Sequence, residues 1–131
     1  MKAKSLIPIL SLLWLLGLII QATAAATDAP VPEAEGIDVE SVYSDPSAYK
    51  GAIKVRGVVM FTDLAEKLFD IIDYREYVAC RVVDCTRHWV TVLFGGKIPA
   101  VARVVEITGA IEKNSAGKGG YVLRAKAVAV K

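Results

Sequence analysis

The segment Ala52-Ile53-Lys54-Val55-Arg56-Gly57-Val58-Val59 decides the fold class of this chain. Ile53, Val55, Gly57 and Val59 alternate in it with Lys54, Arg56 and Val58, the period-two pattern of a strand with one buried face. A glycine inside a strand lets the backbone bend sharply or lets another backbone approach closely. The segment therefore predicts a half-buried strand with Gly57 at a corner of the sheet.

Further stretches toward the C-terminus also carry strand patterns. They are residues 68–73, 89–94, 104–111 and 121–130, separated by polar or glycine-rich connections such as the turn Asn114-Ser115-Ala116-Gly117-Lys118-Gly119-Gly120. Gly109 lies inside one of them and is a second corner candidate. In the last stretch Tyr121, Leu123, Ala125, Ala127 and Ala129 fall on one face. Together with the first segment, these stretches predict five strands.

Five strands in a domain of about 95 residues must protect their edges, and closing into a small barrel does so. We expect an all-β fold, a five-stranded OB-fold-like Greek-key barrel with short helical turns. Those turns are expected after Asp38, from Asp45-Pro46 to Gly51, and within residues 97–103, where Pro99 limits the helix to one turn. Val42, Tyr43 and Tyr49 are expected to close one end of the core.

Residues 1–26 have the pattern of a secretory signal peptide. Lys2 and Lys4 precede an apolar run at 6–20, and small residues follow it. The run of about 15 residues is shorter than the ~20 that a membrane-spanning helix needs. We therefore expect cleavage after Ala24 or Ala26 and export to the periplasm, with a retained leader, and hence a membrane contact, as the alternative.

The rest of the chain is expected to hold a flexible leader and one domain. Residues 27–36 are rich in Pro, Ala and Glu and lack apolar periodicity, whereas 37–131 carry the barrel. Removal of Lys2 and Lys4 with the signal peptide leaves 14 basic against 14 acidic residues. A general nucleic-acid binder owes its affinity to surplus Lys and Arg, so a neutral chain makes that function class unfavourable.

The order of several short motifs carries a resemblance to a known family. They are Asp45-Pro46-x-x-Tyr49-x-Gly51, Val55-Arg56-Gly57-Val58-Val59, Phe69-x-x-x-Asp73, Val92-x-Phe94-Gly95-Gly96-x-Ile98-Pro99, Val105-x-Ile107-x-Gly109 and Tyr121-x-Leu123-x-Ala125-x-x-Val128. In this order they resemble bacterial exported OB-fold domains, and the layout is similar to that of the periplasmic haem chaperones of cytochrome c maturation. Those chaperones attach haem through a histidine beyond the last strand, and no histidine follows His88 here. The resemblance therefore implies the fold and export, and not haem attachment.

Both cysteines and the only histidine gather in residues 73–89. In an oxidising compartment Cys80 and Cys85 are expected to form a disulfide that pins this loop. The alternative is a zinc or copper site of Cys80, Cys85 and His88, completed by Asp73, Glu76 or Asp84. A redox-active pair is a third reading, although its usual C-x-x-C spacing at a helix start is absent.

The same loop supplies the predicted ligand-binding rim. Its members are Tyr74, Arg75, Tyr77, Arg81, Arg87 and His88, because Tyr and Arg give contact area and charge-assisted hydrogen bonds. Phe61, Phe69, Trp89 and Phe94 are expected in the core, with a base-stacking platform as the alternative. No catalytic constellation is present in the sequence. We expect a noncatalytic periplasmic module that binds a protein or small ligand, and a metal-handling protein is the alternative.

Overall fold

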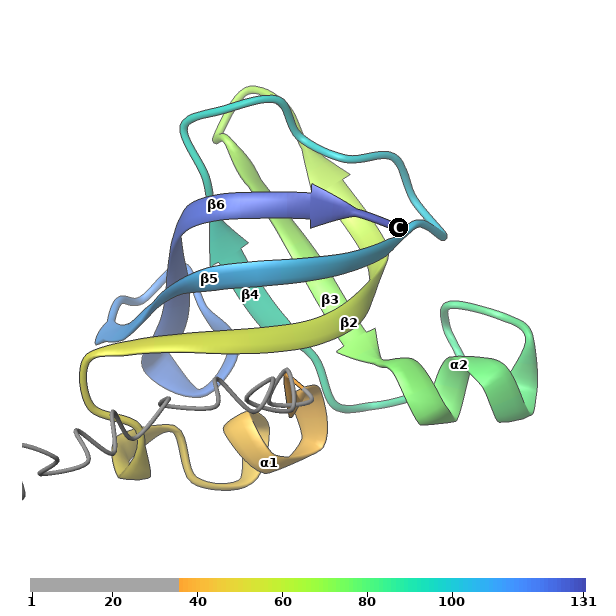
Figure 1. Cartoon of the computed structure of the whole chain (residues 1–131), viewed down its shortest axis with the longest axis horizontal. Coiled ribbons are helices and arrows are strands. Elements are labelled where there is room, and N and C mark those ends of the chain that lie inside the picture. Colours follow the sequence, from red (N-terminus) through yellow and green to blue (C-terminus); the bar gives the residue numbers. More distant parts are fainter. Residues whose placement is uncertain (1–35) are drawn as a thin grey trace, which may run out of the picture. The chain divides into compact units, whose positions relative to one another are not determined.

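The computed structural model describes residues 36–131, so the predicted signal peptide at 1–26 and leader residues 27–35 lie outside the described residues. The elements, shown in Figure 1, are β1 (Ile37–Asp38), α1 (Val39–Ser44), the 3-10 turn η1 (Pro46–Ala48), β2 (Ala52–Asp63), β3 (Leu68–Asp73), α2 (Tyr74–Cys80), β4 (Val90–Leu93), β5 (Val104–Lys113), the 3-10 turn η2 (Lys118–Gly120) and β6 (Tyr121–Val130). The five predicted strands are present as β2 to β6. The turns predicted at Asp38 and Asp45-Pro46 are α1 and η1.

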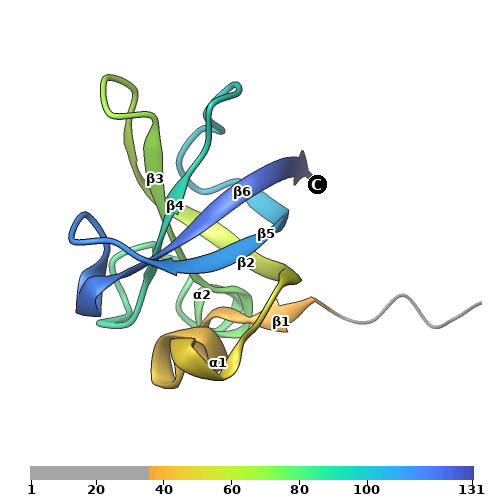
Figure 2. The ribbon, with the colours of Figure 1, turned by 90° about the vertical axis from the view of Figure 1, so that its left-hand side faces the viewer.

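The sheet closes on itself because β2 has a neighbour on each side. The first part of β2 pairs antiparallel with β5, and its second part pairs antiparallel with β3. β4 pairs antiparallel with β3 and parallel with β6, and β6 returns antiparallel to β5. The order β2-β3-β4-β6-β5 is a closed five-stranded barrel of OB-like topology, which confirms the predicted fold class (Figure 2).

The two strand pairings that β6 makes to close the barrel differ in length. β5 and β6 pair along nearly their whole length, whereas β4 and β6 meet only at Val92 opposite Leu123 and at Leu93 opposite Arg124. We call this short parallel contact the seam. Gly57 is the point where β2 changes partner, since it lies opposite both Asp73 and Val105. Its predicted corner position is thereby confirmed.

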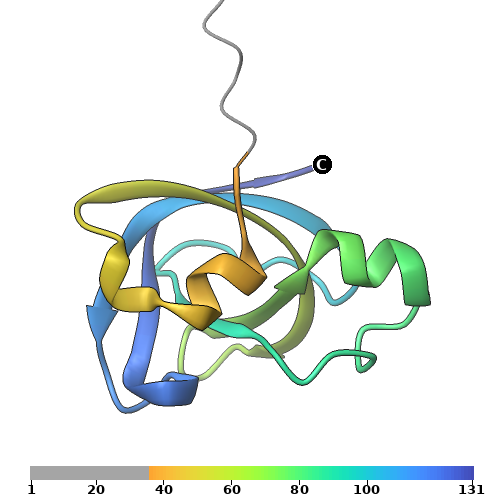
Figure 3. The same cartoon turned by 90° about the horizontal axis from the view of Figure 1, so that it is seen from below.

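The end of the barrel next to β1 is closed by α1, as Figure 3 shows. Val39 and Val42 of this short helix are 0% and 1% exposed and belong to the core. The other core residues are Val55, Val59, Phe69, Ile71, Val90, Val92, Val105, Ile107 and Leu123. Tyr43 and Tyr49 pack against them, as expected. The helical turn expected within residues 97–103 is not formed, and this connection contains no helix.

Two register shifts change which side chains face the core. Between Val59 and Phe61 the pairing of β2 with β3 slips by one residue, so Phe61 points outward and is 51% exposed. Phe69 is buried as predicted, and Phe94 packs partly buried against the core, but the core position predicted for Phe61 is wrong. A bulge reverses alternation because it inserts one extra residue into a strand.

The second shift lies in β6. Thr108 is opposite Ala127 and Gly109 is opposite Ala125, which leaves Lys126 as the extra residue. Beyond it Val128 packs against the core, whereas Ala127 is exposed, so the single apolar face predicted for this strand ends at Ala125. Gly109 permits the bulge, because a Cβ there would lie 2.2 Å from the Arg124 carbonyl oxygen.

No helix within residues 36–131 is long and apolar enough to cross a membrane.

The close approach at Gly109 gives a test of the barrel. Gly109→Ala should lower the free energy of unfolding by about 1–3 kcal/mol, the usual cost of overpacking. Gly95→Ala is the matched control, because a Cβ at Gly95 meets no heavy atom within 4 Å, and its effect should stay within about 0.5 kcal/mol. Urea unfolding measures both, and equal midpoints for the two variants would contradict the close packing of β6 on β5.

Candidate functional site

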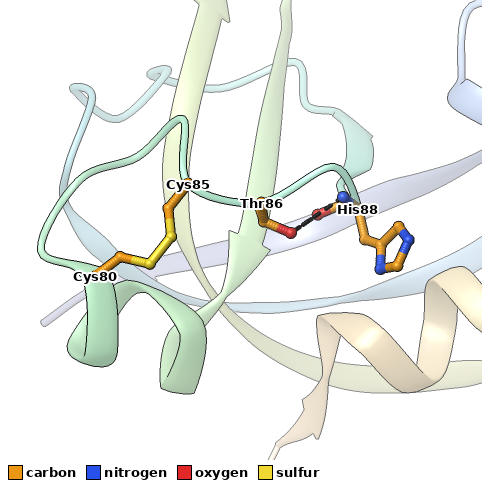
Figure 4. Close-up of a disulfide and its surroundings, with 4 residues drawn as sticks. All are labelled: Cys80, Cys85, Thr86 and His88. Atoms are coloured by element: carbon orange, nitrogen blue, oxygen red, sulfur yellow. Dashed lines mark hydrogen bonds between the residues drawn. A yellow bond between two sulfur atoms is a disulfide. The ribbon is translucent and has the colours of Figure 1, made fainter.

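α2 and a disulfide shape the segment between β3 and β4. The Asp73 carboxylate begins α2 by accepting a hydrogen bond from the Arg75 backbone N–H at 2.9 Å, and the helix ends at Arg81, whose φ of 66° is left-handed. Cys80, the last residue of α2, is disulfide-bonded to Cys85, with 6.3 Å between their Cα atoms (Figure 4). The predicted disulfide is confirmed, whereas no pattern in the sequence indicates α2.

The residues of the alternative metal site do not converge. Both sulfurs are used by the disulfide, and the His88 ring points toward α1, where its Nδ1 lies 2.8 Å from Glu40 Oε2 (Figure 4). Asp73 is 2% exposed and accepts a hydrogen bond from the Glu40 N–H at 3.4 Å. Within residues 36–131 no group of three His, Cys, Asp or Glu side chains is placed to hold zinc or copper.

The six residues predicted at the rim lie in three separate places. Tyr74 and Arg75 border a shallow hollow at the start of α2. The guanidinium carbon of Arg56 lies 4.0 Å from the Tyr74 ring centroid, and Arg75 Nη2 lies 2.8 Å from Asp38 Oδ2. These arginines are therefore already engaged, one by an aromatic face and one by a carboxylate.

The other four predicted residues lie farther along the segment. Tyr77 and Arg81 line a second, open hollow that also touches Ala102. Arg87 and His88 lie just before β4, beside a third cleft. The predicted rim is thus not one surface, and only its last two members adjoin that cleft.

We call the cleft beside Arg87 and His88 the aromatic cleft. Its volume is about 300 Å³, and it lies where α1, the start of β4 and the turn between β5 and β6 meet. Its lining residues are mostly aromatic or aliphatic: Val42, Tyr43, Pro46, Trp89, Val90, Ile111, Lys118, Gly119, Tyr121 and Val122. Segments far apart in the sequence therefore supply one concave surface, the kind that holds small ligands.

Lys118 places a positive charge inside this surface. Its Nζ lies 3.5 Å from the Trp89 ring centroid and 5.4 Å from the Tyr43 ring centroid. The same ammonium donates a hydrogen bond to the Arg87 carbonyl oxygen. Two aromatic faces and one carbonyl thus surround the ammonium, and cation–π contacts of this kind contribute about 0.5–1 kcal/mol at exposed positions.

His88 supports the cleft from outside its lining. Its ring stacks on Tyr43 with 4.4 Å between centroids and 20° between planes, while Nδ1 bonds to Glu40. The Thr86 side chain accepts a hydrogen bond from the His88 backbone N–H at 3.1 Å. Through these contacts the segment that follows the disulfide fixes the position of Tyr43.

The aromatic cleft has few charged groups in its lining. Among the described residues that line the cleft, Lys118 is the only one with a charged side chain, and no carboxylate, imidazole or thiol joins it. Catalytic sites place a nucleophile or an acid–base group within hydrogen-bonding distance of the reacting atoms. The aromatic cleft offers apolar contact area and one positive charge, the Lys118 ammonium.

Sequence reasoning missed most of the cleft. The sequence predicts Tyr43 at one end of the core, Trp89 in the core and Lys118 in an exposed turn, and it does not predict that these three residues share one surface. The available signal was a lone lysine among glycines in that turn, together with Trp89 directly after the cysteine loop. Neither signal indicates that the two residues meet, because the barrel topology brings them together.

Comparison with protein-family models finds no match, and comparison with curated proteins also finds none.

The disulfide predicts the thiol content of the folded protein. Denatured, unreduced protein recovered from the periplasm should contain no titratable thiol. Cys80→Ser should lower the free energy of unfolding by about 2 kcal/mol or less, because the closed loop is short. Two free thiols together with stoichiometric zinc or copper would instead support the metal site of Cys80, Cys85 and His88.

The cap of α1 predicts a pH dependence. Asp38 accepts a hydrogen bond from the Ser41 backbone N–H at 2.8 Å, and hydrogen bonding by Ser41 holds the pKa of Asp38 below its ordinary 3.8. The carboxylate therefore stabilises the fold above that ordinary pKa, and this contribution is lost as pH falls through the lowered value. Asp38→Ala should cost about 1 kcal/mol at pH 7.

Urea midpoints at neutral and acidic pH measure this effect. Asp38→Asn retains a cap that does not titrate, so its stability should depend less on acid pH than that of the wild type. Asp45→Ala is the control, because the Asp45 carboxylate accepts a hydrogen bond from the Ser47 hydroxyl at 2.8 Å but caps no backbone N–H of η1. Equal losses in Asp38→Ala and Asp45→Ala would show that the cap is unimportant.

Proposed function

We propose that this protein is a noncatalytic binding module that works in the periplasm and holds its ligand in the aromatic cleft. The aromatic cleft itself carries the proposal. Tyr43, Trp89 and Tyr121 give it large, rigid contact faces, and a small polar set, the Lys118 ammonium and the Arg87 carbonyl, gives it direction. Mostly apolar concave sites with few polar groups are the usual form of ligand pockets.

The rigid surroundings of the cleft support a binding role. Val42 and Val90 form its floor and are themselves buried in the barrel core. Tyr43 is held from behind by His88. Aromatic side chains that are fixed before a ligand arrives lose little conformational freedom on binding, so more of the contact energy becomes affinity.

The export part of the proposal has independent support. The disulfide is consistent with an extracytoplasmic protein, since such bonds persist in oxidising compartments. The signal-peptide pattern at 1–26 and the resemblance to exported OB-fold domains favour the bacterial periplasm. An OB-like barrel serves many ligands, so the resemblance supports the compartment and the architecture, and the cleft supports the ligand site.

We further infer that α2 provides a secondary contact surface for a protein partner. None of its residues is buried, and Arg75 has a side chain that is 73% exposed. Tyr74, Arg75 and Tyr77 on α2, with Arg81 directly after it, would contact this partner from the two hollows described above, which are separate from the cleft. Substitutions on α2 should therefore leave small-molecule binding at the cleft unchanged.

Nuclear magnetic resonance of the labelled protein tests the ligand site with indole, benzoate and benzylammonium as probes. At least one probe should shift the Trp89 indole N–H and the Gly119 amide, and in Trp89→Leu the shift of the Gly119 amide should be lost. Phe61→Leu is the matched control, because Phe61 is exposed and lies outside the cleft. If no probe shifts these signals, or if all shifts map elsewhere, the proposed site is wrong.

A further inference from the structure

The aromatic cleft already holds a cation, and that cation belongs to the protein. The Lys118 ammonium lies over the Trp89 ring, faces Tyr43 at longer range and donates to the Arg87 carbonyl. A π face and a carbonyl oxygen are the partners that an ammonium group requires when it leaves water. The arrangement therefore shows that this part of the cleft provides the partners of an ammonium group.

We propose, building on the binding function above, that the aromatic cleft takes an alkylammonium group, and that Lys118 is an internal stand-in which this group displaces. The ligand is a primary or methylated amine, presented either as a free small molecule or as the side chain of a lysine. On entry it stacks on Trp89 and Tyr43, and the Lys118 ammonium moves into solvent.

The position of Lys118 makes this exchange easy. The residue is exposed and lies in the turn between β5 and β6, where Gly117 precedes it and Gly119 and Gly120 follow with φ of 72° and 80°. The base of the turn is closed by a 2.9 Å hydrogen bond from the Asn114 N–H to the Gly120 carbonyl. Lys118 can therefore leave without disturbing a buried group or the base of the turn.

The alternative to a cationic ligand is an anionic ligand that binds to the Lys118 ammonium. The contacts of Lys118 favour the cation, because its ammonium is already compensated by an aromatic face and a carbonyl oxygen. An anion would have to draw the ammonium away from these partners, and it would also face the negative π surfaces of Trp89 and Tyr43. Once Lys118 has left, the cleft lining in the described chain contains no cation to hold an anion.

The test follows Trp89 fluorescence in the full chain carrying Trp14→Phe, which leaves Trp89 as the only tryptophan. The probes are choline, butylammonium and a capped lysine peptide, with the uncharged tert-butyl isostere of choline and benzoate as controls. Choline and butylammonium represent free amines, and the peptide represents a protein side chain. If the free amines bind more tightly than the peptide, the ligand is a small molecule; if the peptide binds more tightly, the ligand is a lysine side chain of a protein.

Lys118→Ala should bind the amines about two- to fivefold more tightly than the unsubstituted protein, the factor that corresponds to one exposed cation–π contact. Trp89→Leu, followed through tyrosine signals by nuclear magnetic resonance, should lose amine binding. Lys113→Ala is the matched control, because Lys113 lies at the end of β5 and does not line the cleft. Its affinity for amines should equal that of the unsubstituted protein.

Two outcomes overturn the inference and separate it from the proposed function. If benzoate binds at Trp89 and loses affinity in Lys118→Ala while the amines do not bind, the cleft is a ligand site for anions, and only the amine proposal fails. If no charged or neutral probe reaches Trp89 in the folded protein or in Lys118→Ala, both proposals fail. Circular dichroism of each variant confirms that loss of binding is not loss of fold.

Discussion

The structure depends on the double pairing of β2. One strand serves two neighbours by changing from β5 to β3 at Gly57, where a Cβ would lie 2.9 Å from the Ile72 carbonyl oxygen. Without a strand that bends at this point the sheet would stay open, with unpaired edges and a half-exposed apolar face. Closure creates an interior that eleven buried hydrophobic residues fill, and it also creates a barrel end that must be covered.

The cover of that end also builds the binding surface. α1 is only six residues long, and it inserts Val39 and Val42 into the barrel while presenting Tyr43 at the rim. The segment after the disulfide then meets α1 through His88, which contacts both Tyr43 and Glu40. One short helix thus contributes both to core packing and to the lining of the aromatic cleft, so the cleft lies directly against the core.

Local patterns predicted the strands because alternation of apolar residues is a property of a strand by itself. They failed where a neighbour decides the outcome. The bulges at Met60 and Lys126 depend on the register of the adjacent strand, so the orientation of Phe61 and Ala127 was not visible in the sequence. α2 was missed because Tyr74–Cys80 buries no residue and carries no periodicity. The disulfide followed from two cysteines and a compartment, whereas the cleft joins residues that only the topology brings together.

The aromatic cleft lies next to the seam between β4 and β6, so a ligand in the cleft would affect how firmly the barrel is closed. Trp89 immediately precedes β4 and Tyr121 is the first residue of β6, so the two aromatic walls stand at the starts of the two strands that share the shortest pairing within the five-stranded barrel. An occupant of the cleft that touches both walls would contact both strands of this seam. Because a ligand that binds only the closed form stabilises that form, occupancy of the cleft and resistance of the barrel to opening are linked by mass action. A ligand bound in the cleft would thus act as an additional connection between β4 and β6.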